Sequence, residues 1–173
     1  MERECDMKWS QPGLWLYFVF NFMLIIVSGL PGSGKSYFAS RLAARLDAEY
    51  INSDKTRMAM NRMGRYSVED KWLVYDRMAE LAAGFLDLGK DVVLDGTFYL
   101  RTFRERFAEL ARRRNTDIQY IEVIADDAIV RQRLSRPRKY SEADYKVHEV
   151  IRNLFEPFDQ PHLVLSQGMI QRK

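Results

Sequence analysis

Short apolar runs alternate with longer mixed segments along most of this chain. The apolar runs predict buried strands at 24–28, 48–52, 91–94, 118–124 and 163–165. The segments between them predict helices over 35–47, 67–89, 100–114, 127–136 and 142–155. Strands separated by helices form a parallel sheet with right-handed crossovers. The pattern therefore predicts a three-layer α/β domain, in which helices cover both faces of the sheet.

Individual residues support some of these boundaries. The helix over 100–114 carries Phe103, Phe107 and Leu110 on one stripe, as expected where a helix packs on a sheet. Ser67, with Asp70 three positions later, predicts the start of the helix over 67–89, because a hydroxyl can accept hydrogen bonds from the first free amides. Residues 53–66 are polar and rich in Met and Arg, without a clean period, so no element is predicted there.

The first 22 residues do not follow the alternating pattern. Residues 14–27 are apolar except for Asn21, which is shorter than the about 20 residues that a membrane-spanning helix needs. A signal peptide is disfavoured because no small-residue cleavage site follows and cleavage there would remove a strand. Residues 1–22 are either an extension packed on the domain or sequence upstream of a true start at Met23, and we favour the second interpretation. Residues 23–173 form the domain.

Composition limits the class of protein. The chain has 173 residues, 47% of them hydrophobic and 29% charged, which excludes a disordered chain and a polytopic membrane protein. The net charge of +3 gives little reason to invoke nucleic acid, although it does not oppose a ligand rich in phosphate. The single cysteine, Cys5, cannot form an internal disulfide, so a reducing, cytoplasmic location is expected.

The segment GLPGSGKS matches the phosphate-loop pattern G-x-x-x-x-G-K-[ST] in full. It lies between a predicted strand and a predicted helix, as this motif requires. Backbone amides of such a loop surround a phosphate, and the following helix adds free N–H groups and a positive dipole end. Lys35 is placed to reach the β and γ phosphates, and Ser36 to ligate Mg²⁺. The predicted nucleotide-binding residues are Gly29, Pro31, Gly32, Ser33, Gly34, Lys35, Ser36 and Tyr37. No N-K-x-D tetrapeptide occurs, which disfavours guanine recognition.

Two carboxylates follow predicted strands, at the sheet edge where ligands bind in open α/β folds. Asp54 and Arg57 come after the second strand, and Asp54 can accept the proton of an attacking hydroxyl. The alternative is that Asp54 only caps a helix beginning at Lys55. Asp95 ends the third strand, where an acid can hold the shell of Mg²⁺. Its alternative is a turn or helix cap before Thr97.

A basic cluster follows the fourth strand. It comprises Arg131, Arg133, Arg136, Arg138 and Lys139. An arginine that closes over a transferring phosphoryl group stabilises its charge, so this cluster predicts a basic lid. The alternative is a solvated helix end favoured by the helix dipole. His148 and His162 lack Cys or Glu partners at metal spacing, so no zinc site is predicted.

Taken together, these segments resemble one family. The chain combines MLIIVSGLPGSGKS, SDKTR and VVLDGTF with an R-x-x-R helix end, a Ser-acid-Ala-Asp segment and a closing FEPF. This combination is similar to the small ATP-binding P-loop kinases, which include polynucleotide 5′-kinases, gluconate kinase and zeta-toxin-like enzymes. The similarity covers residues 23 to 166. It implies a five-stranded parallel sheet in the order 2-3-1-4-5, with ATP and Mg²⁺ as cofactors.

The same resemblance implies roles for single residues. Asp54 would be the general base toward the acceptor hydroxyl, and Arg57 would contact a phosphate of the substrate. A small lid over about 136–145 would carry Arg136, which grips the transferring phosphate. Arg133 would lie nearer to the nucleotide base.

The function predicted from these residues is ATP-dependent phosphorylation of a hydroxyl on a small metabolite, nucleoside or sugar. Two alternatives remain. One is a polynucleotide 5′-hydroxyl kinase, with nucleic acid as substrate. The other is a non-catalytic or regulatory nucleotide-binding module, a group in which we also count a toxin-like enzyme acting on an activated sugar. No membrane partner is expected. The acceptor pocket is predicted between residues 54–66, the turn 95–100 and the helix after Ser67, where Tyr66, Phe98 and Tyr99 are candidates to stack on a base or sugar.

Overall fold

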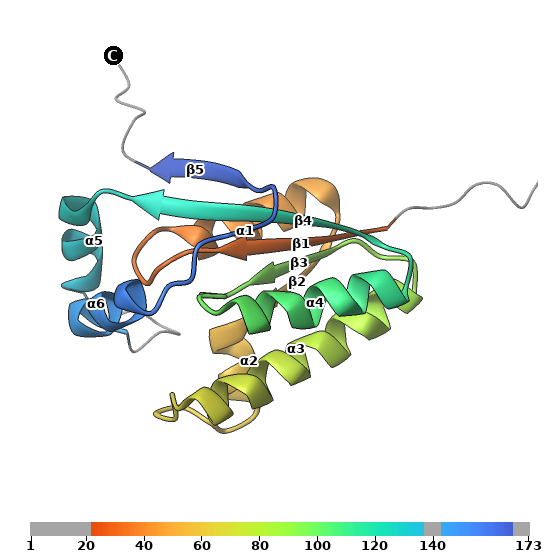
Figure 1. The fold of residues 1–173 in the computed structure, drawn as a ribbon, viewed down its shortest axis with the longest axis horizontal. Coiled ribbons are helices and arrows are strands. Elements are labelled where there is room, and N and C mark those ends of the chain that lie inside the picture. The colour runs from red at the N-terminus through yellow and green to blue at the C-terminus, as the bar shows by residue number, and fades with distance from the viewer. Residues whose placement is uncertain (1–21, 137–142, 168–173) are drawn as a thin grey trace, which may run out of the picture.

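The computed structural model describes residues 22–136 and 143–167, which form one sheet surrounded by helices (Figure 1). The elements in chain order are β1 (Met23–Ser28), α1 (Lys35–Leu46), β2 (Glu49–Asn52), α2 (Ser53–Ala59), α3 (Val68–Asp87), β3 (Val92–Asp95), α4 (Arg101–Arg113), β4 (Asp117–Ala125), α5 (Asp127–Leu134), α6 (Tyr145–Asn153) and β5 (Leu163–Gln167). Each predicted strand is present, with ends within two residues of the prediction.

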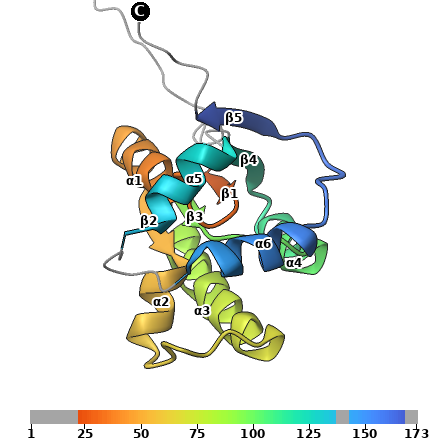
Figure 2. The same ribbon diagram turned by 90° about the vertical axis from the view of Figure 1, so that its left-hand side faces the viewer.

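The five strands are all parallel and lie in the order β2-β3-β1-β4-β5. The predicted fold class and strand order are therefore confirmed. The register places Val27 of β1 and Asn52 of β2 on either side of Asp95 in β3. The strands consequently end at one edge, where α2, α5 and α6 surround the strand ends (Figure 2).

The sheet buries a hydrophobic cluster on each face because the side chains of β1 alternate between them. Leu24 and Ile26 join the larger cluster, which α3 and α4 cover. Ile25 and Val27 join the smaller cluster under α1, with Ala39. At roughly 1.5–3 kcal/mol for each fully buried large aliphatic side chain, these two layers fix the sheet between its helices.

The segment over 53–66 differs from the prediction. Residues Ser53–Ala59 form α2, a helix too short to show a clean period, and the side chain of Asn52 accepts a hydrogen bond from the amide of Lys55 at its start.

Thr97 does not cap a helix, because α4 begins only at Arg101. The last helix begins at Tyr145, capped by Asp144, and not at the predicted position 142.

Some predictions fall outside the described residues. These are the nature of the N-terminal extension, up to residue 21, and the lid residues 137–142 with Arg138 and Lys139. Within 22–136 and 143–167, no helix has the length and apolar character that a membrane span requires.

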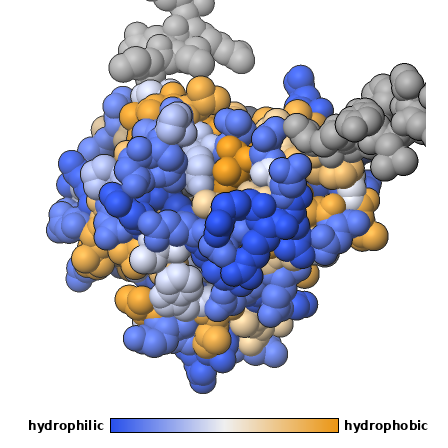
Figure 3. All heavy atoms as spheres, turned by 45° about the vertical axis from the view of Figure 1, so that its right-hand side comes forward, coloured by the Kyte–Doolittle hydropathy of each residue, from blue (hydrophilic) through white to orange (hydrophobic). Residues whose placement is uncertain are grey.

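The surface is mostly hydrophilic on the face shown in Figure 3, with hydrophobic residues in separate groups. One group lies at the top of this view, at the height of the edge strand β5. Leu163 and Val164 of β5 are both exposed. Small groups of exposed apolar residues are ordinary on the surface of a folded domain.

Ser67 begins α3 as predicted, and its hydroxyl accepts a hydrogen bond from the amide of Asp70 at 3.1 Å. We expect Ser67→Ala to lower the free energy of unfolding by about 1 kcal/mol, because one amide at the helix start loses its partner. Urea denaturation measures the change. Ser40→Ala, inside α1, is the matched control and should be neutral or slightly stabilising. Equal effects of the two substitutions would contradict the capping role.

Candidate active site

The phosphate loop connects β1 to α1, and two of its glycines are required by sterics. A Cβ atom at Gly29 would collide with the carbonyl oxygen of Val123. Gly32 has a φ of 85°, and a Cβ there would lie 3.0 Å from Leu134 of α5. These positions allow the loop to turn tightly between β4 and α5 and bring its backbone around the start of α1.

A hollow of about 770 Å³ lies in front of this loop. Its lining residues are Gly32, Gly34, Lys35, Ser36, Tyr37, Gln132, Arg133 and Arg136. The free amides at the start of α1 and the positive end of its dipole make this hollow suited to a phosphate chain. Five of the predicted loop residues thus share this hollow with both predicted arginines, whereas Gly29, Pro31 and Ser33 do not line it.

The two arginines are held differently. Arg133 donates hydrogen bonds at 3.1 Å to the carbonyl oxygens of Gly32 and Ser33, so its guanidinium braces the phosphate loop from α5. Arg136 follows α5 and is exposed at the border of the hollow. An exposed arginine at this border can approach a phosphate without first breaking contacts inside the domain.

Asp95 lies fully buried at the end of β3. Its Oδ2 accepts hydrogen bonds from the hydroxyl of Tyr50 at 2.6 Å and from the amide of Asn52 at 2.5 Å. Burial and the neighbouring carboxylate raise the pKa of Tyr50, so the phenol stays a donor. The sequence alternative of a turn or helix cap is wrong for Asp95, since both of its partners are side chains of β2.

The other oxygen of Asp95, Oδ1, is buried without a hydrogen-bond partner among the described residues. A buried carboxylate oxygen in that state is costly unless water or a cation satisfies it. Carboxylate and hydroxyl oxygens suit Mg²⁺, which retains several of its waters. The buried Oδ1 of Asp95 and the hydroxyl of Ser36, at the start of α1, therefore fit the shell of a hydrated Mg²⁺ ion.

Asp54 lies in the first turn of α2, beyond the residue that caps the helix. Asn52 provides the side-chain cap, so the alternative that Asp54 serves as the cap is wrong. Arg57, one turn later, is 5% exposed. Its guanidinium donates to the carbonyl oxygen of Arg65 and lies 4.7 Å from the ring centroid of Tyr66, whereas its Nε has no partner among the described residues.

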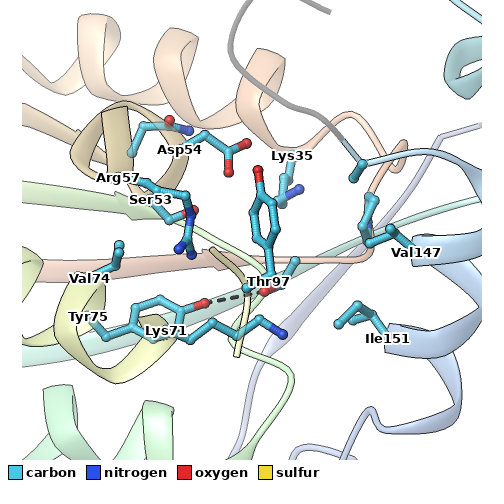
Figure 4. Close-up of a pocket in the computed structure, with 14 residues that line it drawn as sticks. Lys35, Ser53, Asp54, Arg57, Lys71, Val74, Tyr75, Thr97, Val147 and Ile151 are labelled. Atoms are coloured by element: carbon cyan, nitrogen blue, oxygen red, sulfur yellow. Dashed lines mark hydrogen bonds between the residues drawn. The ribbon is translucent and has the colours of Figure 1, made fainter. Parts of the chain in front are cut away.

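Asp54 and Arg57 line a second cavity, of about 150 Å³ (Figure 4). Lys71, Val74 and Tyr75 line it from one face of α3, because positions three and four apart share a helix face. Val147 and Ile151 close the opposite side from α6 (Figure 4). The full lining set is Pro31, Lys35, Asn52, Ser53, Asp54, Arg57, Tyr66, Lys71, Val74, Tyr75, Thr97, Ala143, Val147 and Ile151.

Three residues of the predicted range 54–66, the face of α3 and Thr97 of the predicted turn line this cavity, but two predicted aromatic residues do not. Phe98 and Tyr99 are 0% and 1% exposed and belong to the core, so neither can stack on a ligand. Tyr66 does line the cavity. Sequence reasoning missed Lys71 and the wall from α6. The spacing of residues 71, 74 and 75 was a usable signal for α3, whereas nothing local indicated that α6 would fold over this cavity.

α6 contacts the phosphate loop as well as the cavity. The buried ring of His148 is hydrogen-bonded through Nδ1 to the carbonyl oxygen of Pro31, at 2.8 Å. The same ring stacks on Tyr145, with centroids 5.5 Å apart. His148 thus positions α6 against the loop, and this places Val147 and Ile151 beside the cavity.

Lys35 is the charged residue that the two hollows share. It lines the hollow in front of the phosphate loop and also the cavity beside Asp54. A group bound at the end of a phosphate chain and a group bound beside Asp54 would therefore meet at the Lys35 ammonium. This arrangement is suited to transfer of a terminal phosphoryl group between two ligands.

Comparison with known proteins agrees with this geometry. A protein-family model described as an AAA domain matches residues 24–158. The APS kinase CysC of Mycobacterium tuberculosis, in complex with AMPPNP and APS, superposes with a TM-score of 0.68 at 17% identity, covering 86% of this chain and 90% of that chain. A gluconokinase from Sinorhizobium meliloti gives a TM-score of 0.64 at 16% identity, covering 85% and 83%.

Kti12 of Chaetomium thermophilum, in complex with ADP-AlF3, gives a TM-score of 0.66 at 22% identity, covering 84% of this chain and 89% of that chain. These likenesses cover most of each chain at low identity, so they establish the fold. The predicted resemblance to small P-loop kinases is confirmed. Because the family model matches most of the sequence, the chain belongs to this AAA domain family and has the fold of the small P-loop kinases.

Proposed function

We propose that the protein is an ATP-dependent kinase that transfers the γ-phosphoryl group to a hydroxyl of a small molecule such as a sugar or nucleoside. The observation that carries this proposal is the position of Lys35, which lines both the phosphate-loop hollow and the cavity beside Asp54. The nucleotides in the similar structures, AMPPNP and ADP-AlF3, support a nucleotide in the first hollow. The second cavity has a volume of about 150 Å³, which suits a small acceptor. A cavity of roughly that volume holds a molecule the size of benzene.

The residues then divide the reaction between them. Lys35 and the amides of the loop hold the phosphates, while Arg136 approaches the transferring group from the edge of the hollow. Asp54 orients the acceptor hydroxyl and takes its proton. Arg57 binds the acceptor, and the buried side chain of Ile151 limits access of water to the cavity, which limits wasteful hydrolysis of ATP.

Asp95 and Ser36 are the residues that would hold Mg²⁺. When bound, the ion neutralises charge on the phosphate oxygens. Ser36, at the start of α1, would be a direct ligand. Asp95 would act through a bound water, because its unpartnered Oδ1 is buried at the strand end while its Oδ2 is occupied by Tyr50 and Asn52.

We expect Asp95→Asn to raise the Mg²⁺ concentration needed for half-maximal rate by about 10- to 100-fold, the usual effect of losing an outer-shell carboxylate. Nucleotide affinity measured without metal should change little. The asparagine keeps an oxygen for Tyr50 and Asn52, so the fold should persist. Asp76→Asn, at a surface pair with Arg106, is the matched control. Identical Mg²⁺ titrations for the two variants would remove Asp95 from the metal shell.

The direct test of the proposed function is turnover of ATP against pooled hydroxyl acceptors. The pools contain sugars, sugar acids, nucleosides and oligonucleotides with a free 5′-hydroxyl. We expect a phosphorylated product from a pool of small acceptors. Product from oligonucleotides alone, with a rate that falls steeply with added salt, would instead indicate a polynucleotide kinase. Nucleotide binding without product from any pool would indicate a binding module.

A further inference from the structure

Three cations line the acceptor cavity, and the proposed chemistry assigns one of them, Lys35, to the phosphates of the nucleotide. Arg57 and Lys71 both line the cavity, and neither forms a salt bridge within the part of the chain that the structure describes. Nearby Arg62 differs, since it pairs with Asp70 at 2.8 Å. The one carboxylate among the described lining residues is Asp54, which the proposed chemistry assigns to the hydroxyl.

Lys71 is half-buried beside neutral groups. Its ammonium donates to the hydroxyl of Tyr99 at 3.1 Å and lies 4.5 Å from the centroid of that ring. Burial raises the pKa of Tyr99, so this partner is a neutral phenol at physiological pH. Burial, followed by the charge of Arg57, lowers the pKa of Lys71. The ammonium therefore lies where a further anion would stabilise it.

Arg57 has even less access to solvent. Its side chain is 5% exposed, and its Nε is buried without a hydrogen-bond partner among the described residues. Among the described residues, the guanidinium of Arg57 donates to one acceptor, the neutral carbonyl oxygen of Arg65. A guanidinium presents donors in a planar fork that fits a carboxylate or a phosphate. Removing two neighbouring cations from water without an anion is costly, which indicates that a ligand supplies the anion.

The family resemblance implies that Arg57 contacts a phosphate of the substrate; we propose that Lys71 joins it in an anion subsite, so that the acceptor is a small hydroxyl compound carrying a carboxylate or a phosphate group. The inference rests on the proposed kinase function, because it names the class of acceptor for that cavity. In this arrangement the anion of the acceptor would lie between Arg57 of α2 and Lys71 of α3, and its hydroxyl beside Asp54 and Lys35. Figure 4 shows these four side chains around the cavity.

The rest of the cavity limits the size and character of this acceptor. Val74 is buried, and Val147 and Ile151 face the cavity from α6, so the carbon skeleton of the ligand meets an apolar wall. A volume of about 150 Å³ leaves room for a short skeleton and one anionic group. A neutral acceptor of the same shape would leave Arg57 and Lys71 without a counter-ion. The cavity would therefore bind an anionic acceptor more tightly than a neutral one.

The test measures binding of matched pairs of probes to the full chain with its phosphate loop filled by Mg-AMPPNP. The pairs are D-glycerate and glycerol, D-gluconate and D-glucitol, and glycerol 3-phosphate and glycerol. Calorimetry gives the dissociation constants. We expect at least one anionic probe to bind 10-fold or more tightly than its neutral partner. The carboxylate and phosphate arms identify which anion the subsite takes.

Lys71→Met tests the residue itself, because methionine keeps the length and apolar stem of the side chain. This substitution removes a hydrogen bond to a charged group, so we expect the dissociation constant of the anionic probe to rise by about 10- to 100-fold. Lys71→Arg, which restores a cation, should recover most of the affinity. Lys90→Met, on the exposed loop before β3, is the matched control and should bind as the unmodified chain does.

Three outcomes would overturn the anion subsite: no anionic probe binds, neutral probes bind as tightly as anionic ones, or Lys71→Met matches Lys90→Met. Failure of the kinase proposal gives a different result. In that case the anionic probes bind in a Lys71-dependent manner, while ATP turnover yields no phosphorylated product from any acceptor pool.

Discussion

Replacing Lys35 by methionine is expected to lower phosphoryl transfer by about 10³-fold or more while leaving the domain folded. The ammonium lies where the nucleotide hollow meets the acceptor cavity, so its loss removes a fixed charge from the developing transition state. Lys35 forms no salt bridge among the residues that the structure describes, and methionine keeps the length of its stem. Steady-state turnover and thermal unfolding measure the two effects.

Lys55→Met provides the control for this substitution. Lys55 is an exposed lysine of α2, close to the site in sequence, with its ammonium 5.2 Å from the ring centroid of Tyr50. We expect it to retain most of the activity, since it lines neither hollow. Near-normal turnover of Lys35→Met would contradict the phosphate-loop chemistry. A lowered melting temperature for that variant alone would assign Lys35 a role in stability.

The sheet was predictable because its central strands are buried on both faces. The runs that became β1 and β3 are continuous apolar sequences, and these cannot be stable at a solvated edge. Residues 53–66 carried no such signal. α2 has only seven residues, and its start depends on the Asn52 side chain, which a hydropathy pattern does not report.

The sequence allowed prediction only of those site residues that come directly after a strand. The phosphate loop, Asp54 and Asp95 all follow strands, and parallel strands end at one edge, so their proximity follows from topology. The assignment of Phe98 and Tyr99 to the cavity failed for a physical reason. Arg104, which is fully buried, donates to the carbonyl oxygen of Phe98, and both aromatic side chains pack into the core.

The contribution of α6 could not be read from its own sequence. Its amphipathic pattern indicates one buried face, but the position of that face depends on the contact between His148 and Pro31, residues far apart in the chain. Lys71 was missed for a related reason. On a helix, a lysine is usually solvated, whereas this one is half-buried with its ammonium on Tyr99, a residue 28 positions further along the chain.

Replacing Asp54 by asparagine should reduce transfer by about 10²- to 10⁴-fold, because the amide keeps the shape and an oxygen but cannot accept the proton of the acceptor hydroxyl. The affinity for ATP should remain unchanged, since Asp54 lines the acceptor cavity and not the hollow at the phosphate loop. Single-turnover transfer to the acceptor found by the screen measures the first effect, and nucleotide titration measures the second.

Stability measurements separate this role from a structural one. The cap of α2 is Asn52, so Asp54→Asn should leave the melting temperature unchanged, whereas loss of the Asn52 cap would cost about 1 kcal/mol. Asp87→Asn, at the far end of α3 in a surface pair with Arg114, is the matched control for a change from carboxylate to amide and should keep full activity. If Asp54→Asn transfers phosphate as fast as Asp87→Asn, no proton passes to Asp54. The cavity would then bind the acceptor without supplying its base, and the activation of the hydroxyl would have to come from the charge of Lys35 and the metal.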